Sequence, residues 1–91
     1  MPFTGNLAVL ALDREDWPRA ETVSREALTL SEDVGRQDLI ASNCQRIAKA
    51  LVRQGKPAEA LPHARRAADI YTRLGSPDLE AALATLREGE S

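Results

Sequence analysis

The sequence predicts an all-α fold: an α-solenoid of antiparallel helix hairpins, with about two repeats and a C-terminal helix. Three observations support this prediction: the chain resembles itself at a fixed offset, its apolar residues recur at helical spacing, and prolines and glycines interrupt it at matching places. No stretch alternates apolar and polar residues for long enough to predict a strand. The 91 residues suffice for a single domain. Within 1–91 we expect a first repeat over about residues 1–35, a second over about 36–75 and a terminal helix over about 76–89.

The internal repeat has a period of forty residues. When the chain is shifted by that interval, small and charged residues coincide, and apolar residues fill many of the positions between them. A fixed period of roughly 20–50 residues is typical of stacked supersecondary units that cannot bury their apolar faces alone. The identical pairs include Ala8/Ala48, Ala20/Ala60, Arg25/Arg65, Ala27/Ala67, Gly35/Gly75, Asp38/Asp78, Leu39/Leu79 and Ala41/Ala81.

Helix starts are predicted by capping residues and prolines. Asp16 is an expected N-cap, and Pro18 falls in the first turn, where its missing N–H costs little. For the last helix, Ser76 is the expected N-cap and Pro77 the expected first-turn proline. Asp78 then places an acid beside the positive end of the helix dipole.

Helix ends are predicted by glycines, which adopt the left-handed conformation of a C-cap without steric strain. Gly35 and Gly75 end the second helix of each repeat, and Gly55 ends a helix before Pro57 opens the next. Together these signals predict helices over about 4–13, 17–34, 37–54, 57–74 and 77–88.

The overall charge argues against several classes of partner. The formal net charge is −2, so the chain is no polycation that binds nucleic acids or anionic membranes non-specifically. The charge is nevertheless divided along the sequence, at −4 over residues 1–35, +5 over 36–75 and −3 over 76–91. No apolar run reaches the roughly 20 residues of a membrane span, and the first residues lack the pattern of a secretory signal. We therefore expect a cytoplasmic protein with no membrane or nucleic-acid partner.

Chemistry-bearing residues are sparse. A single cysteine, Cys44, and a single histidine, His63, exclude an internal disulfide and a Cys/His zinc site. The sequence has no glycine-rich phosphate loop, paired catalytic carboxylates or Ser-His-Asp pattern, so we expect no catalysis, cofactor or metal. We expect Cys44 in the core, His63 on the outer surface of the fourth helix, Trp17 at the junction of the first two helices and the Tyr71 hydroxyl at the rim.

The forty-residue unit resembles the tetratricopeptide repeat, a helix hairpin with small residues where its helices cross. Its period exceeds the roughly 34 residues usual in that family. In this it is similar to the long variety found in kinesin light chains and in bacterial ATPase-linked regulators. The matching residues are Leu7, Ala8, Ala11, Trp17, Ala20, Ala27 and Leu28 in the first unit, and Ile47, Ala48, Leu51, Gly55, Ala60 and Ala67 in the second.

The resemblance implies a non-catalytic protein–protein interaction module, part of a larger bacterial regulatory or signalling protein. In such arrays the first helix of each repeat lines a concave groove. The mixed apolar and basic character of that groove predicts a protein or peptide partner, either an acidic–apolar segment or an amphipathic helix. Gly5 and Val9 stand where a carboxylate clamp would need Lys or Asn, which disfavours a chaperone-tail ligand. The expected groove residues are Val9, Leu12, Asp13, Gln45, Lys49, Val52 and Arg53.

Self-association is the alternative to partner binding. Two units and one helix fall short of the roughly three repeats that such stacks need. We therefore expect the chain either to be a piece of a longer array or to form a homo-oligomer by stacking or swapping helices. Nucleic-acid binding through the basic segment 36–75 is disfavoured, because that segment lacks interleaved aromatic residues.

Overall fold

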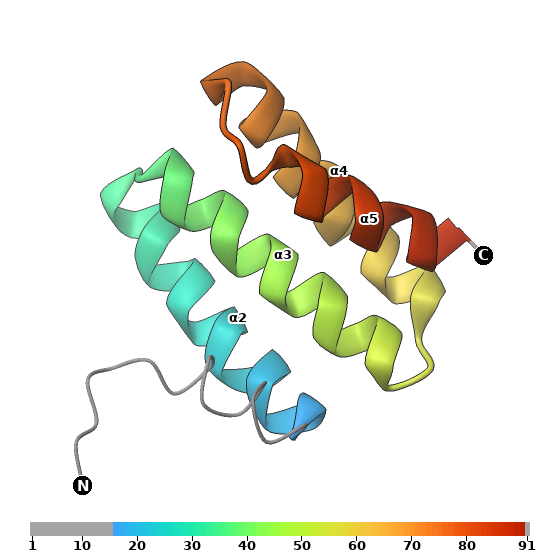
Figure 1. The fold of residues 1–91 in the computed structure, drawn as a ribbon. Coiled ribbons are helices and arrows are strands. Elements are labelled where there is room, and N and C mark those ends of the chain that lie inside the picture. The colour runs from blue at the N-terminus through green and yellow to red at the C-terminus, as the bar shows by residue number, and fades with distance from the viewer. Residues whose placement is uncertain (1–15, 91) are drawn as a thin grey trace, which may run out of the picture.

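The computed structural model describes residues 16–90, which form four helices joined by short turns (Figure 1). Each helix lies within two residues of its expected bounds. The helix expected over 4–13 lies outside the described residues, and no strand occurs within them. The helices are α2 (Trp17–Val34), α3 (Gln37–Arg53), α4 (Pro57–Leu74) and α5 (Leu79–Glu90).

Consecutive helices pack as antiparallel neighbours, and α5 also lies against α3, running in the same direction (Figure 1). α3 therefore contacts α2, α4 and α5. This stacking of helix hairpins confirms the predicted all-α solenoid. None of the described helices is long and apolar enough to cross a bilayer.

The helix termini follow the local signals in the sequence, with one exception. Asp16 caps α2 by accepting a hydrogen bond from the Arg19 backbone N–H at 3.3 Å, as expected. Gly35 and Gly75 follow α2 and α4 in the left-handed conformation, at φ angles of 71° and 66°. The last helix, however, begins two residues later than expected.

The late start of α5 comes from a turn held by Ser76. The Ser76 hydroxyl accepts a hydrogen bond from the Asp78 N–H at 3.1 Å, which holds Pro77 and Asp78 in a turn. An i to i−4 hydrogen bond then runs from Ala82 N–H to the Asp78 carbonyl at 3.2 Å. The expectation that Pro77 lies in the first helical turn was therefore wrong.

Alanine dominates the core. Ile47 and Leu51 are the largest fully buried side chains, and they pack in one cluster with alanines of α3 and α4. Small side chains let two helix backbones approach closely without overlap. Cys44 is fully buried, as expected, and burial raises the pKa of its thiol. The alanines with no exposed surface are Ala20, Ala41, Ala48, Ala50, Ala60, Ala64, Ala67 and Ala82.

His63 differs from expectation, whereas only one side of the Trp17 environment lies within the described residues. His63 is half-buried rather than a plain surface residue, and burial together with the positive charge of Arg25 lowers the pKa of its imidazole. Trp17 is partly buried against Ala20 and Ala50, and so joins α2 to α3; its expected junction with the preceding helix lies outside the described residues.

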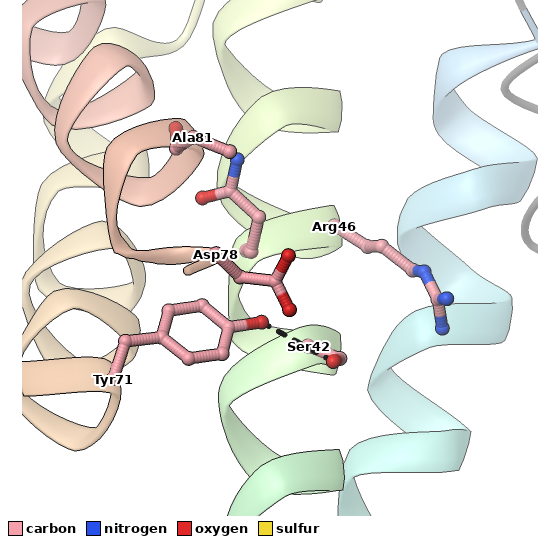
Figure 2. Close-up of a pocket in the computed structure, with 6 residues that line it drawn as sticks. Ser42, Arg46, Tyr71, Asp78 and Ala81 are labelled. Carbon is pink, nitrogen blue, oxygen red and sulfur yellow. Dashed lines mark hydrogen bonds between the residues drawn. The ribbon is translucent and has the colours of Figure 1, made fainter. Parts of the chain in front are cut away.

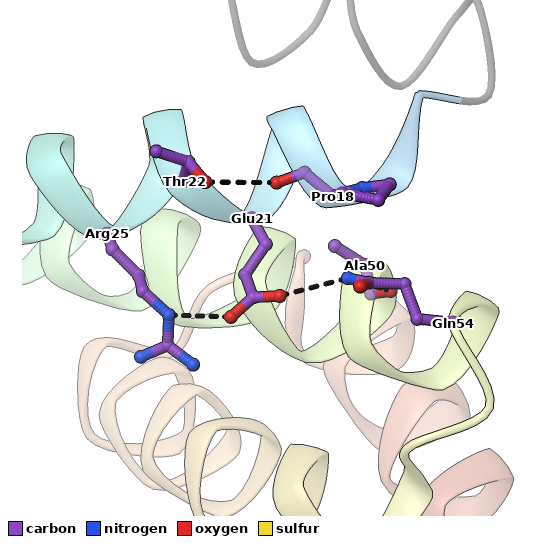
Figure 3. A network of polar contacts seen from close by, with 6 residues as sticks. All are labelled: Pro18, Glu21, Thr22, Arg25, Ala50 and Gln54. Atoms are coloured by element: carbon purple, nitrogen blue, oxygen red, sulfur yellow. Dashed lines mark hydrogen bonds and ion pairs between the residues drawn. The ribbon is translucent and has the colours of Figure 1, made fainter.

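A polar clamp connects α2 to α3 beside this alanine contact (Figure 3). Glu21 accepts hydrogen bonds from Arg25 Nε at 2.8 Å and from Gln54 Nε2, at the end of α3, at 2.9 Å. Burial alone raises the pKa of the Glu21 carboxyl, but these hydrogen bonds and the nearby positive charges outweigh it, so the pKa lies below its ordinary value. The ionised carboxylate therefore stabilises the folded chain.

We expect Glu21→Gln to lower the free energy of unfolding by about 0.5–1 kcal/mol near neutral pH, because it removes a charge-assisted hydrogen bond. The Glu21 contribution is present above the unfolded pKa and is lost as pH falls through the lower folded pKa. Urea unfolding followed by circular dichroism at several pH values measures both effects. The variant should lose less stability on acidification than the wild type. Glu26→Gln, an exposed acid on the same helix, is the matched control, and equal behaviour of the two variants would contradict the clamp.

Candidate protein-binding groove

One face of α3 is turned away from the alanine core and lies beside α5. It carries Ser42, Gln45, Arg46, Lys49 and Arg53, each three or four residues from at least one other of the set and therefore on one side of the helix. All five are partly or fully exposed, whereas Cys44, Ile47 and Leu51 on the core side are fully buried. We call this exposed face, together with the adjoining side of α5, the α3–α5 groove.

One of the expected groove residues, Gln45, holds α5 in place, and another, Val52, packs against the core. Gln45 Nε2 donates to the Ala81 carbonyl at 3.2 Å and to Thr85 Oγ1 at 2.7 Å. Gln45 Oε1 is buried and has no hydrogen-bond partner among the described residues. Val52 is partly buried against the cluster that contains Ile47 and Leu51. These two side chains therefore form the floor of the groove rather than its open surface.

The other two described candidates, Lys49 and Arg53, keep exposed surface on this face of α3. Lys49 is partly exposed and Arg53 is exposed. Neither forms an ion pair within residues 16–90, although Arg25, Arg36, Arg66 and Arg73 all do, with Glu21, Asp38, Glu32 and Asp69 respectively. The groove therefore carries positive charge that no described acidic side chain neutralises.

The remaining expected residues, Val9, Leu12 and Asp13, lie outside the described residues. Their place in the groove stays a prediction.

A pocket of about 240 Å³ opens at the end of the groove where α5 begins (Figure 2). In its wall Tyr71, which is 4% exposed, places its hydroxyl 3.2 Å from Ser42 Oγ. The Tyr71 hydroxyl, which was expected at the rim, therefore lies in the wall of the pocket. The lining residues are Ser42, Gln45, Arg46, Tyr71, Asp78 and Ala81.

Sequence reasoning on α3 alone missed the part of this pocket that other helices provide. Tyr71 lies in the last turn of α4, Asp78 lies in the turn before α5, and Ala81 lies in the first turn of α5. Asp78 and Ala81 do repeat Asp38 and Ala41 at the forty-residue interval, but that signal does not show that the copies face α3.

The family model for the tetratricopeptide repeat matches residues 3–73. The chain belongs to the tetratricopeptide-repeat family. Searches of curated proteins and of solved structures each gave no significant match. Proteins of the tetratricopeptide-repeat family typically act as protein–protein interaction modules, so the α3–α5 groove is the natural place to examine for a partner.

Proposed function

We propose that this tetratricopeptide-repeat chain is a protein–protein interaction module whose α3–α5 groove binds an acidic–apolar segment or an amphipathic helix. The natural setting would be a larger regulatory or signalling protein. The observation that carries the proposal is the pair Lys49 and Arg53, which lie on one helix face without an acidic partner in the described part of the chain.

The groove floor suits a ligand with an apolar side. Val52 and Leu86 are partly buried, and Ala81 exposes a small side chain on α5. Short apolar side chains leave room for the larger ones of a partner, and the basic residues at the rim would pair with acidic residues of the same segment. Such an arrangement is typical of helix-in-groove recognition.

We expect the double substitution Lys49→Glu and Arg53→Glu to weaken peptide binding at least about tenfold, because it turns attraction into repulsion. The ligands are amphipathic peptides selected by display on the wild-type chain, and fluorescence anisotropy measures their affinity. The matched control is Arg19→Glu with Arg65→Glu, two exposed arginines of α2 and α4 outside the groove. Unchanged affinity in the groove variant, or an equal loss in the control, would refute the assignment.

Self-association is a second candidate function, favoured by a specific feature of one end of the molecule. Leu30, Val34 and Leu74 are 67%, 69% and 51% exposed near the ends of α2 and α4, and Leu39 is 41% exposed in the first turn of α3. These termini share the end of the stack that carries Gly35 and Gly75 (Figure 1). Large exposed apolar side chains at one end of a small protein are typical of an association surface.

If this end pairs with a second copy, the apparent mass in light scattering should rise with protein concentration. Leu30→Glu with Val34→Glu should then return the protein to the monomer, because each copy would have to bury a charge. Thr22→Glu with Thr29→Glu, on exposed positions of the same helix, is the control. A strict monomer at high concentration would remove this candidate.

A further inference from the structure

The pocket at the end of the groove where α5 begins is rich in hydrogen-bond acceptors. The Asp78 carboxylate is exposed and has no hydrogen-bond or ion-pair partner in the described part of the chain, because the Ser76 turn uses only the Asp78 backbone N–H. Ser42 and Tyr71 share one hydrogen bond between their hydroxyls, which leaves lone pairs on both oxygens. The orphaned Gln45 Oε1 adds a buried acceptor to the same wall.

The one cation of the pocket lining is directed elsewhere. Figure 2 shows the Asp78 carboxylate directed toward the Ser42–Tyr71 pair, while the guanidinium of Arg46 points away toward α2. Its contact is with Asn43, whose Oδ1 lies 3.4 Å from Arg46 Nη1. The charge of the Asp78 carboxylate is therefore not neutralised by a cation of the pocket lining.

We infer that this pocket binds a basic side chain, Lys or Arg, of the partner, with Asp78 as its counter-charge. The inference rests on the proposed function and adds a charge pattern to it. A lysine ammonium carries three donors and no acceptor, so it complements a carboxylate beside two hydroxyl oxygens. A neutral or acidic side chain would leave the carboxylate unpaired or repelled.

The pattern has a defined spacing. Lys49 follows Ser42 by seven residues, so the two levels of the groove are about 10 Å apart along α3. A partner that fills both levels carries a basic residue over Asp78 and an acidic residue over Lys49. These residues are about seven positions apart in a helical ligand, or about three in an extended one.

The test uses the peptides selected on the wild-type chain and replaces their basic residues by Gln. We expect the replacement at one basic position to weaken binding to the wild type by about fivefold or more, as the loss of an ion pair predicts. For the protein variant Asp78→Asn, the same peptide replacement should change the affinity by less than about twofold, because the variant already lacks the negative charge that pairs with the basic residue. Asp33→Asn, an exposed acid on α2, is the control and should behave as the wild type.

A protein variant and a peptide with exchanged charges distinguish loss of the ion pair from misfolding at the start of α5. Asp78→Lys should reject the selected peptide and accept its Lys→Glu derivative, and loss of α5 folding would not produce that rescue. The inference is overturned if the peptide replacement lowers the affinity for the wild type and for Asp78→Asn equally, or if Asp78→Lys does not bind the Lys→Glu peptide. The proposed function still stands in that case, provided that peptide binding depends on Lys49 and Arg53. If no selected peptide depends on Lys49 and Arg53 for binding, both the proposed function and the further inference are refuted.

Discussion

The close approach of α3 and α4 depends on alanine. Ala48 on α3 and Ala60 and Ala64 on α4 are fully buried in one cluster with Ile47 and Leu51. With so few large side chains in the core, the two backbones must lie near each other to exclude water, and larger residues at these points would separate them. The same constraint acts between α2 and α3, where Ala20 meets Ala50.

This packing determines which face of α3 remains available. Because α2 and α4 cover the alanine side, the opposite side meets α5 among the described helices, through the hydrogen bonds of Gln45 to Ala81 and Thr85. Lys49 and Arg53 remain outside these contacts. The charged surface proposed for binding is thus a consequence of how the core is built, and it lies on a rigid helix rather than on a loop.

Most of the fold could be predicted from the sequence, because its signals are local. Asp16, Gly35 and Gly75 each act within one helical turn, so their positions determine where helices begin and end. The start of α5 was misplaced because the Ser76 hydroxyl stabilises a competing turn that propensity does not reveal.

The groove was less predictable, because its contacts join residues far apart in the chain. Gln45 was expected to face a ligand, but it bonds Ala81 and Thr85, which lie 36 and 40 residues further on. Helical spacing places a side chain on a face without showing what that face meets. The repeat period relates Thr85 to Gln45, which lies forty residues earlier, but it does not show that the two side chains touch.

The most direct measurement of the central claim compares two alanine substitutions on α4 by urea unfolding. Ala64→Leu enlarges a fully buried contact, and Ala58→Leu adds the same atoms at an exposed position of the same helix. Close helix approach predicts that Ala64→Leu lowers the free energy of unfolding by about 1–3 kcal/mol, while Ala58→Leu changes it by less than about 0.5 kcal/mol. Equal stability of the two variants would contradict the claim that alanine at the helix contacts determines this architecture.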